Sequence, residues 1–176
     1  MRYLFAALVL AASACGQGTA DTVPGSATAL TGRVVDRANI LSTAAEKTLT
    51  ERLAALEQRT SDQVVVVTVA SLDNRPIAAV SLELANGWGI GRKDLDNGVM
   101  LLVAPNDRKV RIEVGTGLEG LLTDARAAVV VQSMLPHFRI GDFEQCIGAA
   151  VAEVDRLLSS DRRRPMPKPT AMKEAA

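Results

Sequence analysis

The chain has 176 residues, which is enough for one ordinary domain with short tails. Lys plus Arg equal Asp plus Glu at 20 each, and no basic patch lies in the predicted domain, so the charge pattern argues against nucleic-acid binding. Aromatic residues make up only 3% of the chain, so the core has to be built from Val, Leu, Ile and Ala.

Residues 1–20 are predicted to be a signal peptide. Arg2 supplies the positive charge, and residues 3–12 form an apolar run that is too short for a stable transmembrane anchor. The mature protein is therefore expected outside the cytoplasm, in the periplasm or the cell envelope. Residues 21–32 are rich in Thr, Ala, Gly and Ser, and they are expected to form a flexible linker ahead of the domain.

Two processing routes are open for this signal peptide. Residues 12–16 are similar to a bacterial lipobox, in which Cys15 would be lipidated and would attach the protein to a membrane, although Ala12 replaces the usual Leu. Residues 18–20 instead carry the small side chains that ordinary signal peptidase recognises, and cleavage there releases a soluble protein. By either route Cys146 has no partner for a disulfide inside the domain, and it is expected to be a small buried hydrophobic residue.

Helical patterns recur through the domain, which is assigned to residues 33–160. The predicted helices begin near Thr43 (with Ser42 as a competing N-cap), Pro76, Thr123 and Gly141. In each of them apolar residues recur every three or four positions, as in a helix with one face on a core. Residues 86–87 are expected to end the second helix, and Pro136 is expected to bend or end the third.

Strand patterns lie between these helices. Residues 63–69 and 98–105 are apolar on both faces, which is typical of interior strands that are covered on each side. Residues 110–114 alternate apolar and charged side chains, so this strand is expected nearer the sheet edge. Residues 34–41 are expected to form an extended arm or turn on the domain. Helices and strands that alternate in this way predict an α/β fold with a sheet covered on both faces.

A glycine pattern invites a dinucleotide-binding interpretation at residues 115–120. The spacing argues against it, because the next helix is predicted to begin at Thr123, outside the glycine run, and no strand that ends in an acidic residue follows. The glycines are expected instead to provide backbone freedom where the chain leaves a strand and turns toward a helix.

Binding of a metal ion through oxygen ligands is the main site chemistry that the sequence leaves open. One His and one domain Cys cannot make a closed zinc shell, and the chain has no Gly-x-Ser-x-Gly nucleophile motif. Residues 94–98 begin like a calcium loop but do not complete the EF-hand pattern. Acidic and amide side chains lie in predicted loops or at element ends: Asp36, Asp94, Asp96, Asn97, Glu119 and Asp124. Loops at one end of a sheet can bring such oxygens together around Ca²⁺ or Mg²⁺.

Motifs in the same order along the chain resemble the TPM-domain family over residues 33–158. They lie at residues 35–42, 88–91, 96–105, 111–115, 117–119, 122–125 and 136–143. The resemblance implies a three-layer α/β/α sandwich, with a small mixed sheet covered by helices on both faces, in an exported or membrane-tethered protein. Relatives are described as divalent-cation binders, as acid-phosphatase-like and as accessory proteins associated with the envelope, with repair or with receptors. By position, Asp36, Asn97, Glu119 and Asp124 match the family's acidic and amide positions.

The leading hypothesis is an extracytoplasmic accessory domain with a role in the maintenance or interaction of envelope proteins. In it, Ca²⁺ or Mg²⁺ joins three loops through five side chains: Asp36, Asp96, Asn97, Glu119 and Asp124. One alternative is a metal-assisted, acid-phosphatase-like hydrolase, for which no catalytic nucleophile is identifiable. The other is a metal-free interaction module, in which an envelope protein binds the exposed sheet edge. Residues 161–176 are expected to be a basic, Pro-rich, disordered tail.

Overall fold

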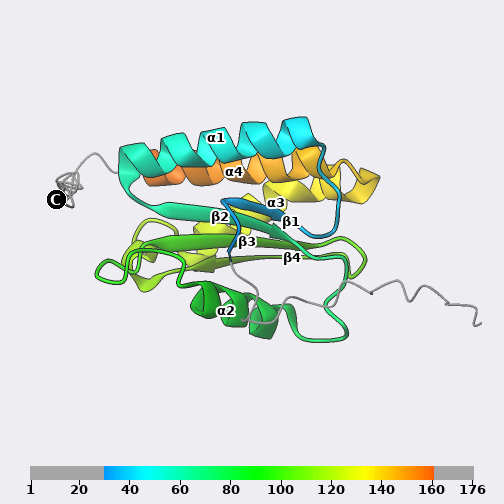
Figure 1. The fold of residues 1–176 in the computed structure, drawn as a ribbon, viewed down its shortest axis with the longest axis horizontal. Helices are drawn as coiled ribbons and strands as arrows, with labels where there is room; N and C mark the ends of the chain where they lie inside the picture. The colour runs from blue at the N-terminus through cyan, green and yellow to red at the C-terminus, as the bar shows by residue number, and fades with distance from the viewer. Residues whose placement is uncertain (1–29, 161–176) are drawn as a thin grey trace, which may run out of the picture.

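The computed structural model of the chain describes residues 30–160, and Figure 1 shows their three layers. The middle layer is a four-stranded sheet in the order β1 (Val34–Asp36), β2 (Gln63–Thr68), β3 (Gly98–Ala104) and β4 (Lys109–Val114). β1, β2 and β3 run parallel, and β4 runs antiparallel to β3. The mixed sheet and the α/β/α sandwich that were expected are confirmed. The predicted signal peptide with Cys15, most of the linker and the basic tail lie outside the described residues.

Helices cover both faces of the sheet. One face packs against α1 (Thr43–Thr60), α3 (Asp124–Ile140) and α4 (Phe143–Ser159), and the other packs against α2 (Ile77–Trp88). In Figure 1, α1 and α4 lie above the sheet and α2 lies below it. A short 3₁₀ turn, η1 (Thr116–Leu118), joins β4 to the segment that leads into α3.

The strands β2 and β3 are buried on both faces, as their apolar sequences predict. Val66 and Leu101 belong to the core under α1, α3 and α4, whereas Val67 and Leu102 belong to the core under α2. Each side chain of this size contributes about 1.5–3 kcal/mol when it is fully buried. The two interior strands therefore hold the outer helical layers together and fix where their own ends lie.

Capping residues explain where the helices begin and end. Ser42 is the N-cap of α1, where its hydroxyl accepts a hydrogen bond from the Ala45 N–H at 3.2 Å. The second helix ends at Trp88, just beyond the expected end at residues 86–87, because Gly89 caps it in the left-handed conformation (φ 59°) that closes a helix.

The expectation that Pro136 ends the third helix is wrong. α3 continues to Ile140, and Gly141 caps it with a φ of 75°. Pro136 lacks the N–H that would bond the Gln132 carbonyl, and both residues lie on the exposed side of the helix, where water can reach the backbone most easily.

The strand β4 is the half-exposed edge that its alternating sequence predicts. Lys109, Arg111 and Glu113 pair with Ala104, Leu102 and Met100 of β3, and they therefore lie on the α2 face of the sheet. The intervening Val110, Ile112 and Val114 pack against the core on the opposite face. β4 therefore carries a charged row on one face and an apolar row on the other.

Candidate functional site

The loop that precedes β3, residues 91–97, is called here the Asn97 loop. Asn97 is only 3% exposed, and protein groups satisfy its carboxamide. Its Oδ1 accepts a hydrogen bond from the Arg92 N–H at 2.9 Å, and its Nδ2 donates to the Ser61 carbonyl at 2.7 Å and to Asp62 Oδ1 at 3.1 Å. The predicted ligand Asn97 therefore ties its loop to the end of α1.

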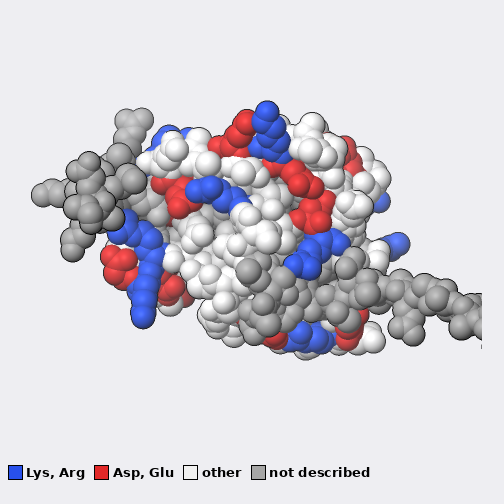
Figure 2. All heavy atoms as spheres, viewed as in Figure 1, with Lys and Arg blue, Asp and Glu red and all other residues white. Residues whose placement is uncertain are grey.

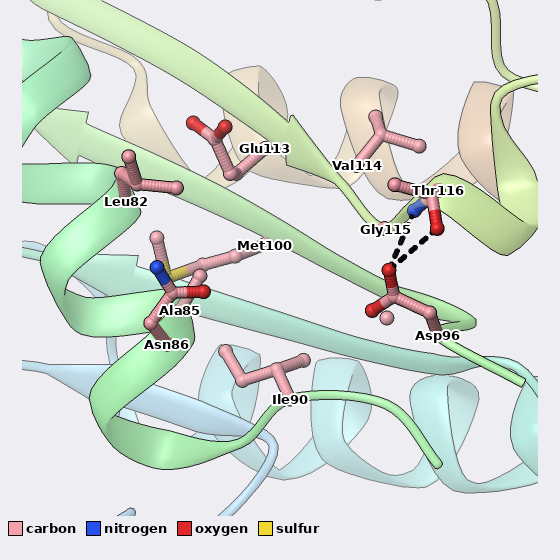
Figure 3. Close-up of a pocket in the computed structure, with 11 residues that line it drawn as sticks. Leu82, Ala85, Asn86, Ile90, Asp96, Met100, Glu113, Val114, Gly115 and Thr116 are labelled. Carbon is pink, nitrogen blue, oxygen red and sulfur yellow. Dashed lines mark hydrogen bonds between the residues drawn. The ribbon is translucent and has the colours of Figure 1, made fainter. Parts of the chain in front are cut away.

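Asp96, in the same loop, is exposed and accepts two hydrogen bonds from Thr116. Its Oδ2 accepts hydrogen bonds from the Thr116 hydroxyl at 2.7 Å and the Thr116 N–H at 3.0 Å (Figure 3). Both bonds stabilise the carboxylate and so hold the pKa of Asp96 below its ordinary value. The bond from the hydroxyl has the larger effect and the bond from the N–H the smaller. Asp96 therefore joins the Asn97 loop to the turn after β4.

Two glycines of the Gly115–Gly120 run allow this loop and this turn to touch. A Cβ atom at Gly115 would overlap the Asp96 carbonyl oxygen, and one at Gly117 would overlap the Leu95 carbonyl oxygen. Gly115 has a φ of −67°, which any residue adopts, so the expected need for unusual backbone freedom is wrong at this position. Close packing of two backbones explains the glycine spacing here.

A polar hollow of about 410 Å³ lies beside β4 and is called here the β4-edge hollow. It is lined by Arg111, Ile112, Glu113, Val114, Glu119, Leu122, Thr123, Asp124 and Ala127. Among these, Glu119 and Asp124 are exposed carboxylates with no hydrogen bond or ion pair to the rest of residues 30–160. The structure thus brings two of the five predicted ligands to one hollow.

A polar network that was not predicted from the sequence lies between α2 and β4. Glu113 Oε2 accepts hydrogen bonds from the buried Ser81 hydroxyl and from Arg111 Nε, both at 2.8 Å. Arg111 Nε also donates to the Ser81 hydroxyl oxygen at 3.0 Å. Only the packing of α2 on β4 reveals this network, because the three residues share no local motif.

A second hollow, of about 170 Å³, lies between α2 and the strands β3 and β4 (Figure 3). Leu82, Ile90 and Met100 supply apolar walls, and Glu113 and Asp96 lie along its rim. Pockets for drug-sized ligands generally measure about 300–1,000 Å³. This hollow is smaller than that range and supports no ligand assignment.

Asp36 lies at the opposite end of the sheet. Asp36 of β1 pairs with Thr68 of β2, which pairs in turn with Val103 near the end of β3. The Asn97 loop instead leads into the start of β3 at Gly98. The separation along β3 alone is about 16 Å at 3.3 Å per residue. The expected meeting of three loops around one ion therefore does not form.

The Asp36 carboxylate also has partners of its own. Its Oδ1 accepts a hydrogen bond from the Thr68 hydroxyl, and its Oδ2 accepts one from the Leu41 N–H at 2.8 Å. These bonds hold the segment that leads from β1 to α1, so the structure gives Asp36 a clear architectural role.

The described residues contain neither a cluster of metal-binding side chains nor a reactive thiol. Residues 30–160 hold no group of three or more His, Cys, Asp or Glu side chains placed to bind one ion. Cys146 is fully buried, and its burial, with the nearby Asp142 charge second, raises the pKa of the thiol to about 11. The expectation of Cys146 as a small buried hydrophobic residue is confirmed.

The outer edge of β4 is free of a partner strand. The Gly115 N–H donates to the Gly98 carbonyl at 2.8 Å, and residues of an antiparallel ladder alternate between bonding inward and outward. Arg111 and Glu113 therefore bond to β3, whereas the N–H and C=O groups of Val110, Ile112 and Val114 point outward. Within the described part of the chain no strand pairs with them. The alternating pattern of residues 110–114 predicts a strand near the sheet edge, but only the register identifies the outward groups.

Surface charge shows no single-sign field on the face drawn in Figure 2. Basic and acidic side chains of the described residues are interspersed there, which agrees with a formal net charge of zero. Among the helices of residues 30–160, none has the length and apolar character needed to span a bilayer.

Comparison with protein families gives one match. The model of the TPM domain matches residues 34–157, which include all four strands and nearly all of the last helix. A comparison with curated proteins gives no match.

Solved structures share the fold. The solution structure of the N-terminal domain of a protein from P. gingivalis is 35% identical, with a TM-score of 0.67, over 72% of this chain and 81% of that one. The N-terminal domain of the cg2496 protein from Corynebacterium glutamicum is 20% identical, with a TM-score of 0.58, over 78% and 85% of the two chains. The BA42 protein of Bizionia argentinensis is 18% identical, with a TM-score of 0.60, over 68% and 81%. The last two support the fold alone.

Proposed function

The chain belongs to the TPM domain family, and from that premise we propose that its domain is a protein-interaction module of the cell envelope. The module binds an extended segment of another polypeptide along the free edge of β4. The observation that supports this proposal is the row of outward backbone groups at Val110, Ile112 and Val114 beside the β4-edge hollow. A free strand edge is a ready template for one more strand.

The surroundings of β4 suit an added strand. Neighbouring strands lie about 4.8 Å apart, so a bound segment would occupy the space next to β4 that the hollow provides. Main-chain hydrogen bonds would supply affinity without regard to sequence. The charged row on β4 and the carboxylates of Glu119 and Asp124 would then select among partners.

The location outside the cytoplasm is part of this proposal and rests on residues 1–20. If Cys15 is lipidated, the module is held at a membrane surface by the chain that precedes the domain. Mass spectrometry of the mature N-terminus tests this point. A lipid-modified Cys15 supports an anchor, an N-terminus at Asp21 supports soluble export, and an intact Met1 contradicts both.

Photo-crosslinking in cells that make the protein tests the interaction. A photoreactive residue at Lys109, at the start of the β4 edge, should give a discrete adduct, whereas one at the exposed Lys47 on α1 should not. Ile112→Pro removes one outward N–H and no β3 ladder bond, so it should abolish the adduct. Ile112→Val keeps that N–H and should retain the adduct. An adduct that persists unchanged in Ile112→Pro, or no adduct at all from Lys109, contradicts the proposal.

Divalent-cation binding is a second candidate function, at a smaller site than the sequence suggested. The observation in its favour is that Glu119 and Asp124 line one hollow without internal partners. Two carboxylates with water and backbone oxygens form a weak site for Ca²⁺ or Mg²⁺. The hydrolase alternative gains no specific support from the described residues and stays a prediction.

Thermal unfolding with and without CaCl₂ tests cation binding. An ion that binds only the folded state raises the melting temperature by mass action. The rise should disappear in the double variant Glu119→Gln/Asp124→Asn and persist in Asp36→Asn, because Asp36 lies at the other end of the sheet. A melting curve that calcium leaves unchanged contradicts this candidate.

A further inference from the structure

The charges along β4 change sign from its start to its end. Lys109 and Arg111 are followed by Glu113 on the same face of the strand. Arg108 is exposed just before the strand and Glu119 is exposed after it, whereas the carboxylate of Asp107 accepts a hydrogen bond from the Leu72 N–H at 2.8 Å. An edge that is basic at one end and acidic at the other complements a copy of itself that runs in the opposite direction.

One register of such a self-pair uses the outward backbone groups fully. A two-fold axis through Ile112 sets Ile112 opposite itself and Val110 opposite Val114 of the second copy. These are the residues whose N–H and C=O groups face away from β3, so each of them finds a hydrogen-bonding partner. The same register sets Arg111 opposite Glu113 of the second copy, once on each side of the axis. The cross-strand contact adds to the ion pair that Arg111 and Glu113 already make within one chain, and opposite charges stabilise such pairs.

The competing arrangements fit less well. A two-fold axis through Arg111 sets Arg111 against itself and leaves Val114 without a partner. A parallel, in-register pair sets Lys109 against Lys109 and Glu113 against Glu113, and like charges directly opposite one another are destabilising. The strand thus specifies both the direction and the register of its own pairing.

We propose that the segment bound at the β4 edge is β4 of a second copy of this chain, paired antiparallel about Ile112. The inference rests on the proposed function and names its partner. The two four-stranded sheets then continue as one sheet across the dimer. Each β4 strand lies in the space beside the other that the β4-edge hollow provides, and the edge on which an unrelated strand would aggregate is covered.

Sedimentation velocity on the full mature chain tests the dimer. Two variants with altered charge on β4 test the register of the pairing. Arg111→Glu makes the edge acidic on both sides of the axis, and Glu113→Arg makes it basic on both sides. Each variant alone should stay monomeric, and an equimolar mixture should form a heterodimer, since every acidic position of one variant then faces a basic position of the other. Because both variants disturb the contact with Ser81, their fold is checked by circular dichroism. Restoration on mixing is not expected of variants that are merely misfolded.

A cysteine at the axis reports the register. Residues in a hydrogen-bonded antiparallel pair have Cα atoms about 5.5 Å apart, within the range that a disulfide spans. Ile112→Cys should therefore oxidise to a covalent dimer, whereas Asn106→Cys in the turn ahead of β4 should not. The native Cys146 is buried and does not compete.

The outcomes separate this inference from the proposed function. A chain that is monomeric at every concentration, gives no Ile112→Cys dimer and shows no association of the mixed charge variants overturns the second-copy assignment. If Lys109 still gives a photo-adduct of a different mass that Ile112→Pro abolishes, the edge binds another protein and the proposed function stands. If no adduct forms, both fail.

Discussion

The Asn97 loop and the β4-edge hollow lie at the same end of the sheet, and both carry several acidic side chains. In the Asn97 loop the polar groups are used by the fold. Asn97 bonds to Arg92, Ser61 and Asp62, and Asp96 bonds to Thr116. In the hollow, Glu119 and Asp124 have no such partners within residues 30–160.

The difference shows that a loop carboxylate or amide becomes a candidate ligand only when its internal partners are known. A carboxamide that already makes three hydrogen bonds at 3% exposure stabilises the protein, and drawing it onto an ion would break those bonds. An exposed carboxylate without internal partners can bind a ligand without the loss of any hydrogen bond of the fold. The following predictions test this contrast, from the largest expected effect to the smallest.

Asn97→Ala should cause the largest loss, about 3 kcal/mol of unfolding free energy, because it leaves the Arg92 N–H and the Ser61 carbonyl without their partner. Urea unfolding measures the change. Asn106→Ala, at an exposed turn position, is the matched control and should lie within about 0.5 kcal/mol of the native protein. Equal effects in the two variants would show that the Asn97 amide is dispensable to the fold.

Gly117→Ala should be the next most harmful change, at about 1–3 kcal/mol, because the added methyl group overlaps the Leu95 carbonyl oxygen and separates the loop from the turn. Gly120→Ala, where a Cβ atom meets nothing within 4 Å, should be close to neutral. Thermal unfolding compares the two. A native-like melting temperature for Gly117→Ala would refute the close contact.

Thr116→Val should have a smaller, pH-dependent effect. The pKa of Asp96 is lowered in the folded protein, so its contacts stabilise the fold above the ordinary pKa of 3.8, and that contribution is lost as the pH falls through the folded value. The variant loses the hydroxyl bond and keeps the backbone bond. It should be less stable than the native protein near neutral pH, and the gap should close in acid.

NMR titration of the Asp96 carboxyl carbon provides the direct measurement. Its pKa should move upward in Thr116→Val toward the ordinary value, because the larger of the two stabilising hydrogen bonds is gone. An unchanged titration curve would contradict the assignment of that bond.

Glu119→Gln should have the smallest effect on stability, within about 0.5 kcal/mol, since the carboxylate has no internal partner to lose. The same urea experiment measures it. If the loss approached that of Asn97→Ala, the hollow would be structural in the same sense as the loop, and the contrast between the two regions would collapse.

Local patterns predicted most of the fold. The apolar runs at residues 63–69 and 98–105 predicted interior strands, since few places other than the middle of a covered sheet bury both faces of a strand. Helix starts were predictable because capping acts within one turn, as at Ser42. The end of α3 was not, because the tolerance of Pro136 depends on which side of the helix is exposed.

The candidate site was less predictable. Asp36 and Glu119 look equivalent in sequence, as acidic residues at the ends of predicted elements. Parallel pairing of β1 with β2 places Asp36 at one end of the sheet, and antiparallel pairing of β4 with β3 places Glu119 at the other. Strand direction is a long-range property that no local pattern around either residue encodes.

By itself, the sequence determined the α/β class, the approximate positions of the helices and strands, and the half-exposed character of β4, because these depend on hydrophobic periodicity and capping over a few residues. Only the tertiary structure decided which carboxylates are satisfied, which end of the sheet each occupies, and that the N–H and C=O groups of Val110, Ile112 and Val114 face outward. The reason is physical, since hydrogen-bond satisfaction and strand register depend on groups far apart in the chain.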